Sequence, residues 1–241
     1  MTEQLRLFPL KTVLFPGAVL NLHIFEPRYK QMIAECLDAG EAFGVVLIEE
    51  GQEAGDPAVI PHDIGTTAEI ADVTELPLGR YYISTVGRRR FRIENILGRD
   101  PYLTVEVTYL ADVSVEPQAL HKLGDEVRIE FSEYVELLVE LSGSYADYAL
   151  PDDAADASYL IGDALQVAES LKQRLLELTS AFERLTVELG FLRRLLPQLR
   201  SLAERKRAGL IEVVDDVDES PQERRARADQ TKFFGKHFSA N

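Results

Sequence analysis

The chain is poor in the residues that form disulfides and metal sites: among 241 residues there is one cysteine, and the four histidines are His23, His62, His121 and His237. A single cysteine excludes a disulfide within the chain. Cys36 falls on the apolar side of a predicted helix, so it is predicted to be a buried, inert thiol. The histidines are far apart and show no H-E-x-x-H or cysteine-rich spacing. The sequence therefore predicts no metal site.

Catalytic motifs are missing as well. There is no G-x-x-x-x-G-K-[ST] loop, because the single Gly-Lys pair, at Gly235, is followed by His237 and has no glycine-rich segment before it. There is no G-x-S-x-G nucleophile turn. The sequence therefore predicts a protein that is not an enzyme and that uses no cofactor.

Basic residues are in the minority, with 26 lysines and arginines against 41 aspartates and glutamates and a net charge of −15. This charge opposes binding to nucleic acid, where affinity comes from basic contacts that release counterions. No apolar run approaches the 18 or so residues of a membrane span, and no charged-then-apolar leader precedes Leu5. We expect a cytoplasmic protein that has no membrane partner.

The densest structural signal lies in Leu5–Gly40. Alternating residues predict a strand at its start, Pro16-Gly17 is typical of a type II turn, and Leu20, Leu22 and Ile24 alternate with Asn21 and His23. Pro27 can open a helix, which Gly40 would end. Apolar residues recur along it at helical spacing: Tyr29, Met32, Ile33, Cys36 and Leu37.

Beyond Gly40 the period of the apolar pattern divides the chain into two halves. Short strands with turn signals between them are predicted at Phe43–Glu49, Ile64–Leu76, Arg80–Val86, Arg88–Leu97 and Tyr102–Leu110. Helical spacing replaces this pattern near Val113. The fold class predicted is α+β, with a β-rich subdomain at 1–113, an α-helical bundle at 114–208 and a charged tail at 209–241.

The helical half contains a run of heptad spacing between Leu171 and Leu199. Such a run is compatible with an intermolecular coiled coil or with a helical bundle within the chain. The bundle is favoured because amphipathic helices usually bury their apolar face against other parts of the same chain. Ser180 and Glu183 have the capping-box spacing, which predicts that one helix ends and another begins there. Pro197 predicts a kink.

Four segments of the chain carry a family resemblance: LFPLKTVLFPG with the following L-x-L-x-IFEPRY-x-x-M, FGVVLI at Phe43–Ile48, IGTTAEI at Ile64–Ile70, and VGRRRFRI at Val86–Ile93. They resemble the Lon substrate-binding domain, the N-terminal domain of Lon-type ATP-dependent proteases that is also seen in cereblon and in stand-alone bacterial proteins. The resemblance implies a PUA-like pseudo-barrel in the N-terminal half and a stand-alone form without ATPase or protease domains. It further implies a non-catalytic module that recognises unfolded or exposed apolar segments of other proteins, as an adaptor in quality control that could work with a protease or chaperone.

Two sets of residues are candidates for binding. Prolines on both sides of the first apolar run argue against a fully covered strand, so some of its side chains are expected near the surface. The candidate peptide-binding residues are Phe8, Leu10, Phe15, Tyr29 and Met32. The competing interpretation is that the helical half covers them.

The alternative function is RNA binding, because PUA-like folds include RNA binders. On a regular strand Arg88, Arg90 and Arg92 would share one face. A solvated strand face paired with acids is the competing interpretation, and it is favoured by the net charge.

Overall fold

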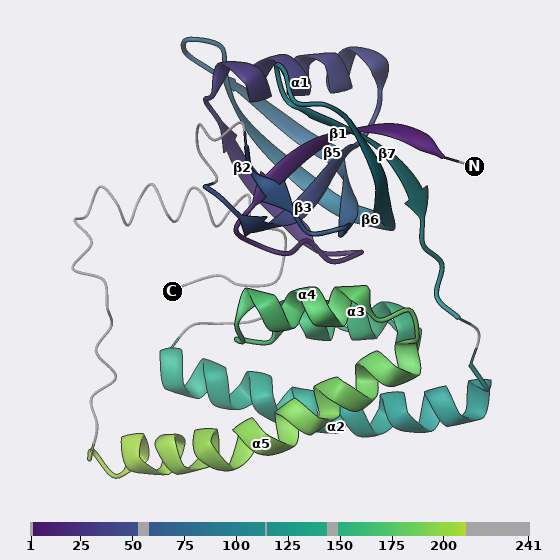
Figure 1. Ribbon diagram of the computed structural model, residues 1–241. Helices are drawn as coiled ribbons and strands as arrows, with labels where there is room; N and C mark the ends of the chain where they lie inside the picture. Colours follow the sequence, from purple (N-terminus) through teal and green to yellow (C-terminus); the bar gives the residue numbers. More distant parts are fainter. Residues whose placement is uncertain (1, 53–57, 114, 144–148, 211–241) are drawn as a thin grey trace. The chain divides into compact units, whose positions relative to one another are not determined.

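A computed structural model describes residues 2–52, 58–113, 115–143 and 149–210. These residues form the predicted α+β fold, with a seven-stranded sheet and five helices (Figure 1). The chain divides into two compact units. Unit 1 comprises Met1–Ser114 and Tyr159–Ala181, and unit 2 comprises Val115–Ser158 and Phe182–Asn241. The predicted tail at 209–241 lies outside the described residues from residue 211 onward.

Unit 1 is built around a closed β-barrel. Its strands neighbour one another in the order β1 (Glu3–Leu10), β7 (Leu103–Tyr109), β6 (Arg80–Gly98), β5 (Ile64–Leu76) and β3 (Phe43–Glu50). A parallel pairing of β1 with β3 closes the ring, whereas the other pairings are antiparallel. The short β4 (Ile60–Pro61) adds to β3, and β2 (Val19–Ile24) adds to β6. The predicted pseudo-barrel is confirmed, and ring closure pairs strands that would otherwise leave edges open.

Inward-facing apolar side chains fill the barrel. Leu5 and Leu7 of β1 lie in one buried cluster with residues of three other strands, namely Val46, Phe91, Leu103, Val105 and Val107. The alternation of these residues along β1 and β7 follows from the strand period of two. The N-terminal apolar pattern is therefore a core pattern.

Helix α1 (Pro27–Ala39) forms where the sequence predicts it. Pro27 opens the helix, where its missing N–H costs nothing. Gly40 ends it in the left-handed region at φ 66° and ψ 32°, which a residue with a side chain rarely adopts. Tyr29, Met32 and Cys36 are on the buried side of the helix, as its spacing predicts.

Strand β6 runs without a break through Gly87, where the sequence predicts an interruption. Gly87 N–H donates to the Ala18 carbonyl at 2.9 Å, and a Cβ atom at this position would lie 2.1 Å from the Phe15 carbonyl oxygen. Glycine is therefore required at position 87, where the loop that contains Phe15 and Ala18 crosses the strand.

The same strand contains a bulge just beyond Gly87. Gly87 is opposite Ala68 and Arg90 is opposite Thr66, so Arg88 and Arg89 together face a single residue of β5, Thr67. The Thr67 hydroxyl accepts a hydrogen bond from the Arg89 N–H at 3.0 Å. A bulge of this kind shifts by one residue the alternation of side chains between the two faces.

Unit 1 also includes a segment from the helical half of the sequence. Helix α3 (Ala154–Ala164) passes from unit 2 to unit 1 at Tyr159, and α4 (Glu169–Glu177) belongs to unit 1. Gln173 of α4 donates to the Ile64 carbonyl at 3.1 Å, and the Val113 N–H donates to the Thr179 carbonyl at 2.7 Å. These units differ from the predicted ranges 1–113 and 114–208, because bonds to backbone carbonyls leave no pattern in the sequence.

Unit 2 contains a pair of long parallel helices, α2 (Pro117–Ser142) and α5 (Ala181–Arg207). Arg200 pairs with Glu133, and Arg207 with Glu140. Both pairs, like that of Arg193 with Glu126, join residues 67 positions apart. A constant offset over steps of seven residues means that the helices run in the same direction in a coiled-coil register.

The buried stripe of α5 contains Leu185, Leu189, Leu192 and Leu196, which lie in the interior of the folded chain. This agrees with the predicted bundle. The helix break predicted at Ser180 is confirmed, since α4 ends at Glu177 and α5 begins at Ala181. Helix α5 continues through Pro197 to Arg207, so the proline does not end it.

Among the described residues of unit 2, the ionisable side chains of Arg184 and Glu188 are buried. Arg184 Nε donates to the Ser158 hydroxyl at 2.7 Å. Burial raises the pKa of the Glu188 carboxyl well above its ordinary value, against the lowering effect of the Arg184 charge. Burial therefore favours the protonated form of Glu188.

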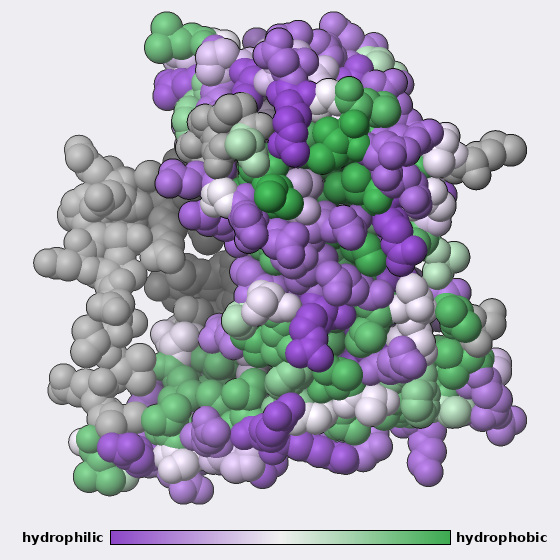
Figure 2. All heavy atoms as spheres, viewed as in Figure 1, coloured by the Kyte–Doolittle hydropathy of each residue, from purple (hydrophilic) through white to green (hydrophobic). Residues whose placement is uncertain are grey.

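Apolar side chains at the surface are unevenly distributed. Figure 2 shows hydrophilic residues over most of the visible face of unit 1, with separate apolar groups between them, and a longer apolar band over the helices of unit 2. Among the described residues, no helix combines the length and the apolar character needed to cross a membrane.

Candidate functional site

The five predicted peptide-binding residues lie in the interior of unit 1. Phe8 stacks on Tyr29 with ring centroids 4.0 Å apart, and it packs against Phe43 at 6.1 Å. Met32 and Phe15 are fully buried, and Leu10 is buried as well. The expectation that these side chains lie near the surface is wrong. Helix α1 covers β1, and its Tyr29 and Met32 side chains are part of the core.

Phe15 belongs to the loop between β1 and β2, and the helical segment of unit 1 holds that loop in place. The Val13 N–H donates to Glu169 Oε2 at 2.8 Å, at the first residue of α4. Gly17, in the turn after Phe15, lies beside Leu160 of α3. For this loop, therefore, the competing interpretation from the sequence is correct: helices cover the apolar residues.

The arginine strand does not present a basic face. Arg90 is 2% exposed, whereas Arg88 and Arg92 lie at the surface. Arg90 and Phe91 are opposite Thr66 and Gly65 in regular register, so they lie on opposite faces of β6: Phe91 is in the barrel core, and Arg90 is buried against α4. The bulge at Arg88 and Arg89 takes Arg88 out of the regular alternation with Arg90. Arg88 forms a two-pronged ion pair with Glu69, in which both N···O distances are 3.0 Å. The expectation that the three arginines share a face is wrong.

Arg90 has a structural role in unit 1. Its Nη1 donates to the carbonyls of Leu176 and Leu178, each at 2.6 Å, and its Nη2 forms an ion pair with Asp112. Asp112 also accepts a hydrogen bond from the Tyr159 hydroxyl at 2.9 Å. The guanidinium group thus satisfies carbonyls at the C-terminal end of α4, where a cation is favourable.

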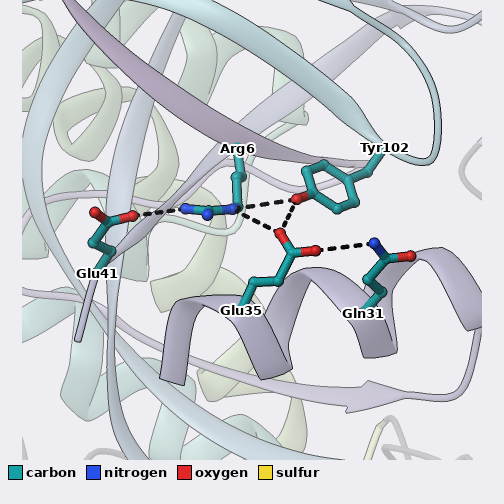
Figure 3. Close-up of polar contacts among 5 residues, drawn as sticks. All are labelled: Arg6, Gln31, Glu35, Glu41 and Tyr102. Atoms are coloured by element: carbon teal, nitrogen blue, oxygen red, sulfur yellow. Dashed lines mark hydrogen bonds and ion pairs between the residues drawn. The ribbon is translucent and has the colours of Figure 1, made fainter. Parts of the chain in front are cut away.

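A second polar network joins α1 to the barrel (Figure 3). Arg6 of β1 reaches between Glu41, at 2.7 Å, and Glu35 of α1, at 3.3 Å. The Tyr102 hydroxyl donates to Glu35, and Gln31 donates to the same carboxylate at 2.9 Å. The hydrogen bond from Tyr102 is the main cause that lowers the pKa of Glu35, and burial is the main cause that raises the pKa of Tyr102. Each of the five side chains therefore has a partner within the network.

This network predicts a measurable effect of acid. Because the pKa of Glu35 is lowered in the folded protein, its ionised form contributes stability above the pKa of an unfolded glutamate, about 4.3, and this contribution is lost as the pH falls through the folded value. Glu35→Gln is expected to lower the melting temperature at pH 7, and the difference from the parent protein should shrink towards pH 3. Melting curves at half-unit pH steps measure it, with Glu75→Gln on exposed β5 as the control. A difference that stays constant down to pH 3 would contradict the assignment.

Cys36 has the character predicted for it. Its side chain is buried, and burial raises the pKa of the thiol to about 11. The thiolate is therefore disfavoured at neutral pH. Within the described ranges, no group of three or more His, Cys, Asp or Glu residues is arranged to hold a metal ion.

Three aromatic rings at the surface of unit 1 form the candidate functional site, called here the aromatic patch: His23, Phe25 and Tyr82. The His23 ring lies 4.7 Å from that of Tyr82 and 5.6 Å from that of Phe25. Phe25 is 56% exposed and Tyr82 is 43% exposed. Single exposed apolar residues are common, but rings in contact with one another form a continuous surface that usually has a partner.

Strand pairing explains how the aromatic patch forms. His23 of β2 is directly opposite Tyr82 of β6, and Phe25 follows two residues after His23, on the same side. Among the described residues β2 pairs with β6 alone, so its other edge is not hydrogen-bonded to a neighbour. The strand VLNLHI contains no lysine or proline to protect that edge. Asn21 and His23 point to the other side of β2 from Leu22 and Ile24. Continuing this alternation by one residue places Phe25 on the same side as His23.

Solved structures share this fold. The Lon N-terminal domain protein from Xanthomonas campestris is 28% identical, with a TM-score of 0.59, over 78% of this chain and 98% of that one. The N-terminal domain of the Mycobacterium avium complex Lon protease is 17% identical and has a TM-score of 0.58, which shows a common fold. The class that the barrel and helices define is therefore the Lon N-terminal domain.

Sequence comparison identifies the family directly. The model of the ATP-dependent protease La (LON) substrate-binding domain matches residues 4–194, so the chain belongs to the LON substrate-binding domain family. Lon proteases of Amoebophilus asiaticus and Brevibacillus choshinensis are 27% and 26% identical over 75% and 79% of this chain. The chain spans only 22% and 25% of the length of those two relatives.

Proposed function

We propose that this protein is a non-catalytic recognition module that binds exposed apolar segments of other proteins at the aromatic patch. The observation that carries the proposal is the group of surface rings at His23, Phe25 and Tyr82, in a family of substrate-binding domains. Aromatic side chains bury a large area per residue and are common anchors of protein interfaces. In this role the protein would be an adaptor that presents bound segments to a protease or chaperone. We place it in the cytoplasm on the strength of the family resemblance.

RNA binding is not advanced as a second function. Arg90 is committed to carbonyls and Asp112, and Arg88 is paired with Glu69. Of the three arginines proposed for RNA binding, Arg92 is therefore the one that is exposed and has no ion pair with another described residue. A single arginine is too small an electrostatic footprint for a protein of charge −15.

The patch predicts which substitutions weaken binding. Phe25→Ser and Tyr82→Ser are each expected to weaken binding of a labelled, reduced and carboxymethylated polypeptide by about tenfold, the loss of about 1.4 kcal/mol that truncation of an aromatic anchor typically causes. Exposed positions contribute little to folding, so the melting temperature should stay within about 2 °C of the parent value. Fluorescence anisotropy measures the binding, and differential scanning fluorimetry measures the stability.

Leu97→Ser is the matched control, because Leu97 is also on β6, is apolar and is 54% exposed, and belongs to no ring cluster. It should leave binding unchanged. Equal binding by the parent protein and both patch variants would move the site elsewhere, and an absence of binding by the parent protein would refute the proposed function. Cleavage of the polypeptide, or ATP turnover that persists through further purification, would refute its non-catalytic part.

A further inference from the structure

The part of the chain beyond the described residues contains a segment whose chemistry matches the aromatic patch. Residues 211–241 follow the end of α5, and their sequence has two distinct parts. The first, 212–219, contains five acids, Glu212, Asp215, Asp216, Asp218 and Glu219. The second, TKFFGKHF at 231–238, combines Phe233, Phe234 and Phe238 with Lys232 and Lys236.

We infer that residues 231–238 bind the aromatic patch and compete there with external polypeptides. The inference rests on the proposed function, since it names a regulator of the same site. Phenylalanine rings are natural partners for the exposed faces and edges of Phe25 and Tyr82. The unpaired edge of β2 beside the patch offers backbone N–H and C=O groups to whatever chain lies there.

Charge selects the second part of the tail over the first. Asp72 is exposed on β5 and is opposite Ser84, two residues along β6 from Tyr82, so it lies on the same face of the sheet as the patch. No ion pair joins Asp72 to another described residue. Lysines at 232 and 236 complement this carboxylate, whereas the acids at 212–219 would be repelled by it and by the net charge of −15.

The connecting length allows the contact wherever the two units lie. Twenty residues separate Leu210 from Thr231, and an extended chain of that length spans up to about 70 Å at 3.3–3.6 Å per residue. A folded chain of this size has a radius of gyration of about 18 Å. Tethering at such lengths gives an effective concentration on the order of millimolar, so even a weak contact is occupied much of the time.

The expected consequence is a gain of affinity when the tail rings are removed. Phe233→Ser combined with Phe234→Ser in the full chain should tighten binding of the labelled polypeptide by about fivefold, as expected if the tail occupies the patch for about four-fifths of the time. Val213→Ser combined with Val214→Ser is the matched control, because it removes two apolar side chains from the acidic part. It should leave affinity unchanged. Anisotropy titrations of the three proteins measure the effect.

A synthetic peptide of residues 229–240 separates this inference from the proposed function. It should displace the labelled polypeptide from the Phe233→Ser, Phe234→Ser protein and bind that protein directly, and Phe25→Ser in the patch should weaken the direct binding by about tenfold. Unchanged affinity of the tail variant, or peptide binding that is indifferent to Phe25→Ser, would overturn the inference while leaving polypeptide binding intact. If no protein binds the polypeptide, the proposed function fails, and the direct peptide titration still decides the inference.

Discussion

Replacing Arg90 with methionine is expected to lower the free energy of unfolding by about 3–5 kcal/mol, the typical loss when one partner of a buried ion pair is removed. Arg90 is 2% exposed, and it bonds two carbonyls at the C-terminal end of α4 as well as Asp112. Methionine fills similar space without a donor. The carbonyls of Leu176 and Leu178 and one bond to Asp112 would then lack their partner in the interior, where each unsatisfied group is costly.

Urea unfolding followed by circular dichroism measures this loss. Arg92→Met is the matched control, since Arg92 is an exposed arginine on the same strand, and it should change the free energy of unfolding by less than about 0.5 kcal/mol. A loss below about 1 kcal/mol for Arg90→Met would show that α4 is held to the barrel by other contacts.

The second large effect is expected at the buried aromatic residues of the N-terminal segment. Phe15→Ala should cost about 3–5 kcal/mol, because a phenylalanine of 0% exposure leaves a cavity that its neighbours fill only in part. Phe8→Asp and Phe15→Asp should prevent folding altogether, since each places an unpaired carboxylate in the core. Thermal and urea unfolding report the first variant, and soluble yield with circular dichroism reports the other two.

Phe25→Asp is the control for this series, because it places the same charge on an exposed phenylalanine. It should fold with nearly the parent stability while losing polypeptide binding. If Phe15→Asp folded normally and lost binding instead, the loop around Phe15 would be open in solution and the site would have to be reassigned to it.

Local features of the fold were predictable because they depend on neighbouring residues. Helix α1 follows from Pro27 at its start, helical spacing along its buried face and the left-handed Gly40 at its end. The break at Ser180 follows in the same way from its capping pattern. Both signals are complete within a few residues, so no distant contact is needed to interpret them.

Features that depend on distant partners were not predictable. The heptad run indicated a packed helix, but only the constant offset between Arg200 and Glu133, and between Arg207 and Glu140, identifies α2 as its parallel partner. Regular alternation predicted that Arg88, Arg90 and Arg92 share a surface, whereas a bulge opposite Thr67 displaces Arg88 and α4 covers Arg90.

The burial of the candidate peptide-binding residues was not predictable for a related reason. Prolines in the first apolar run indicated an incompletely covered strand, whereas α1 and the segment around Glu169 cover it. Phe25 lay two residues beyond His23 on the polar side of β2, which is a weaker signal than a run of apolar residues. The contact between Phe25, His23 and Tyr82 depends on the pairing of β2 with β6, which the sequence does not show.

The contacts of Arg90 also set an order of events during synthesis on the ribosome. Its carbonyl partner Leu176 lies 86 residues further along the chain, so at about 5–20 residues per second the partner follows roughly 4 to 17 seconds later. For most of that interval the barrel strands and Asp112 have been made, but the two carbonyl groups that accept hydrogen bonds from Arg90 have not. A nascent chain arrested near residue 113 would therefore contain the ion pair without those carbonyl partners, and unit 1 would be completed only after the first part of unit 2 had been translated.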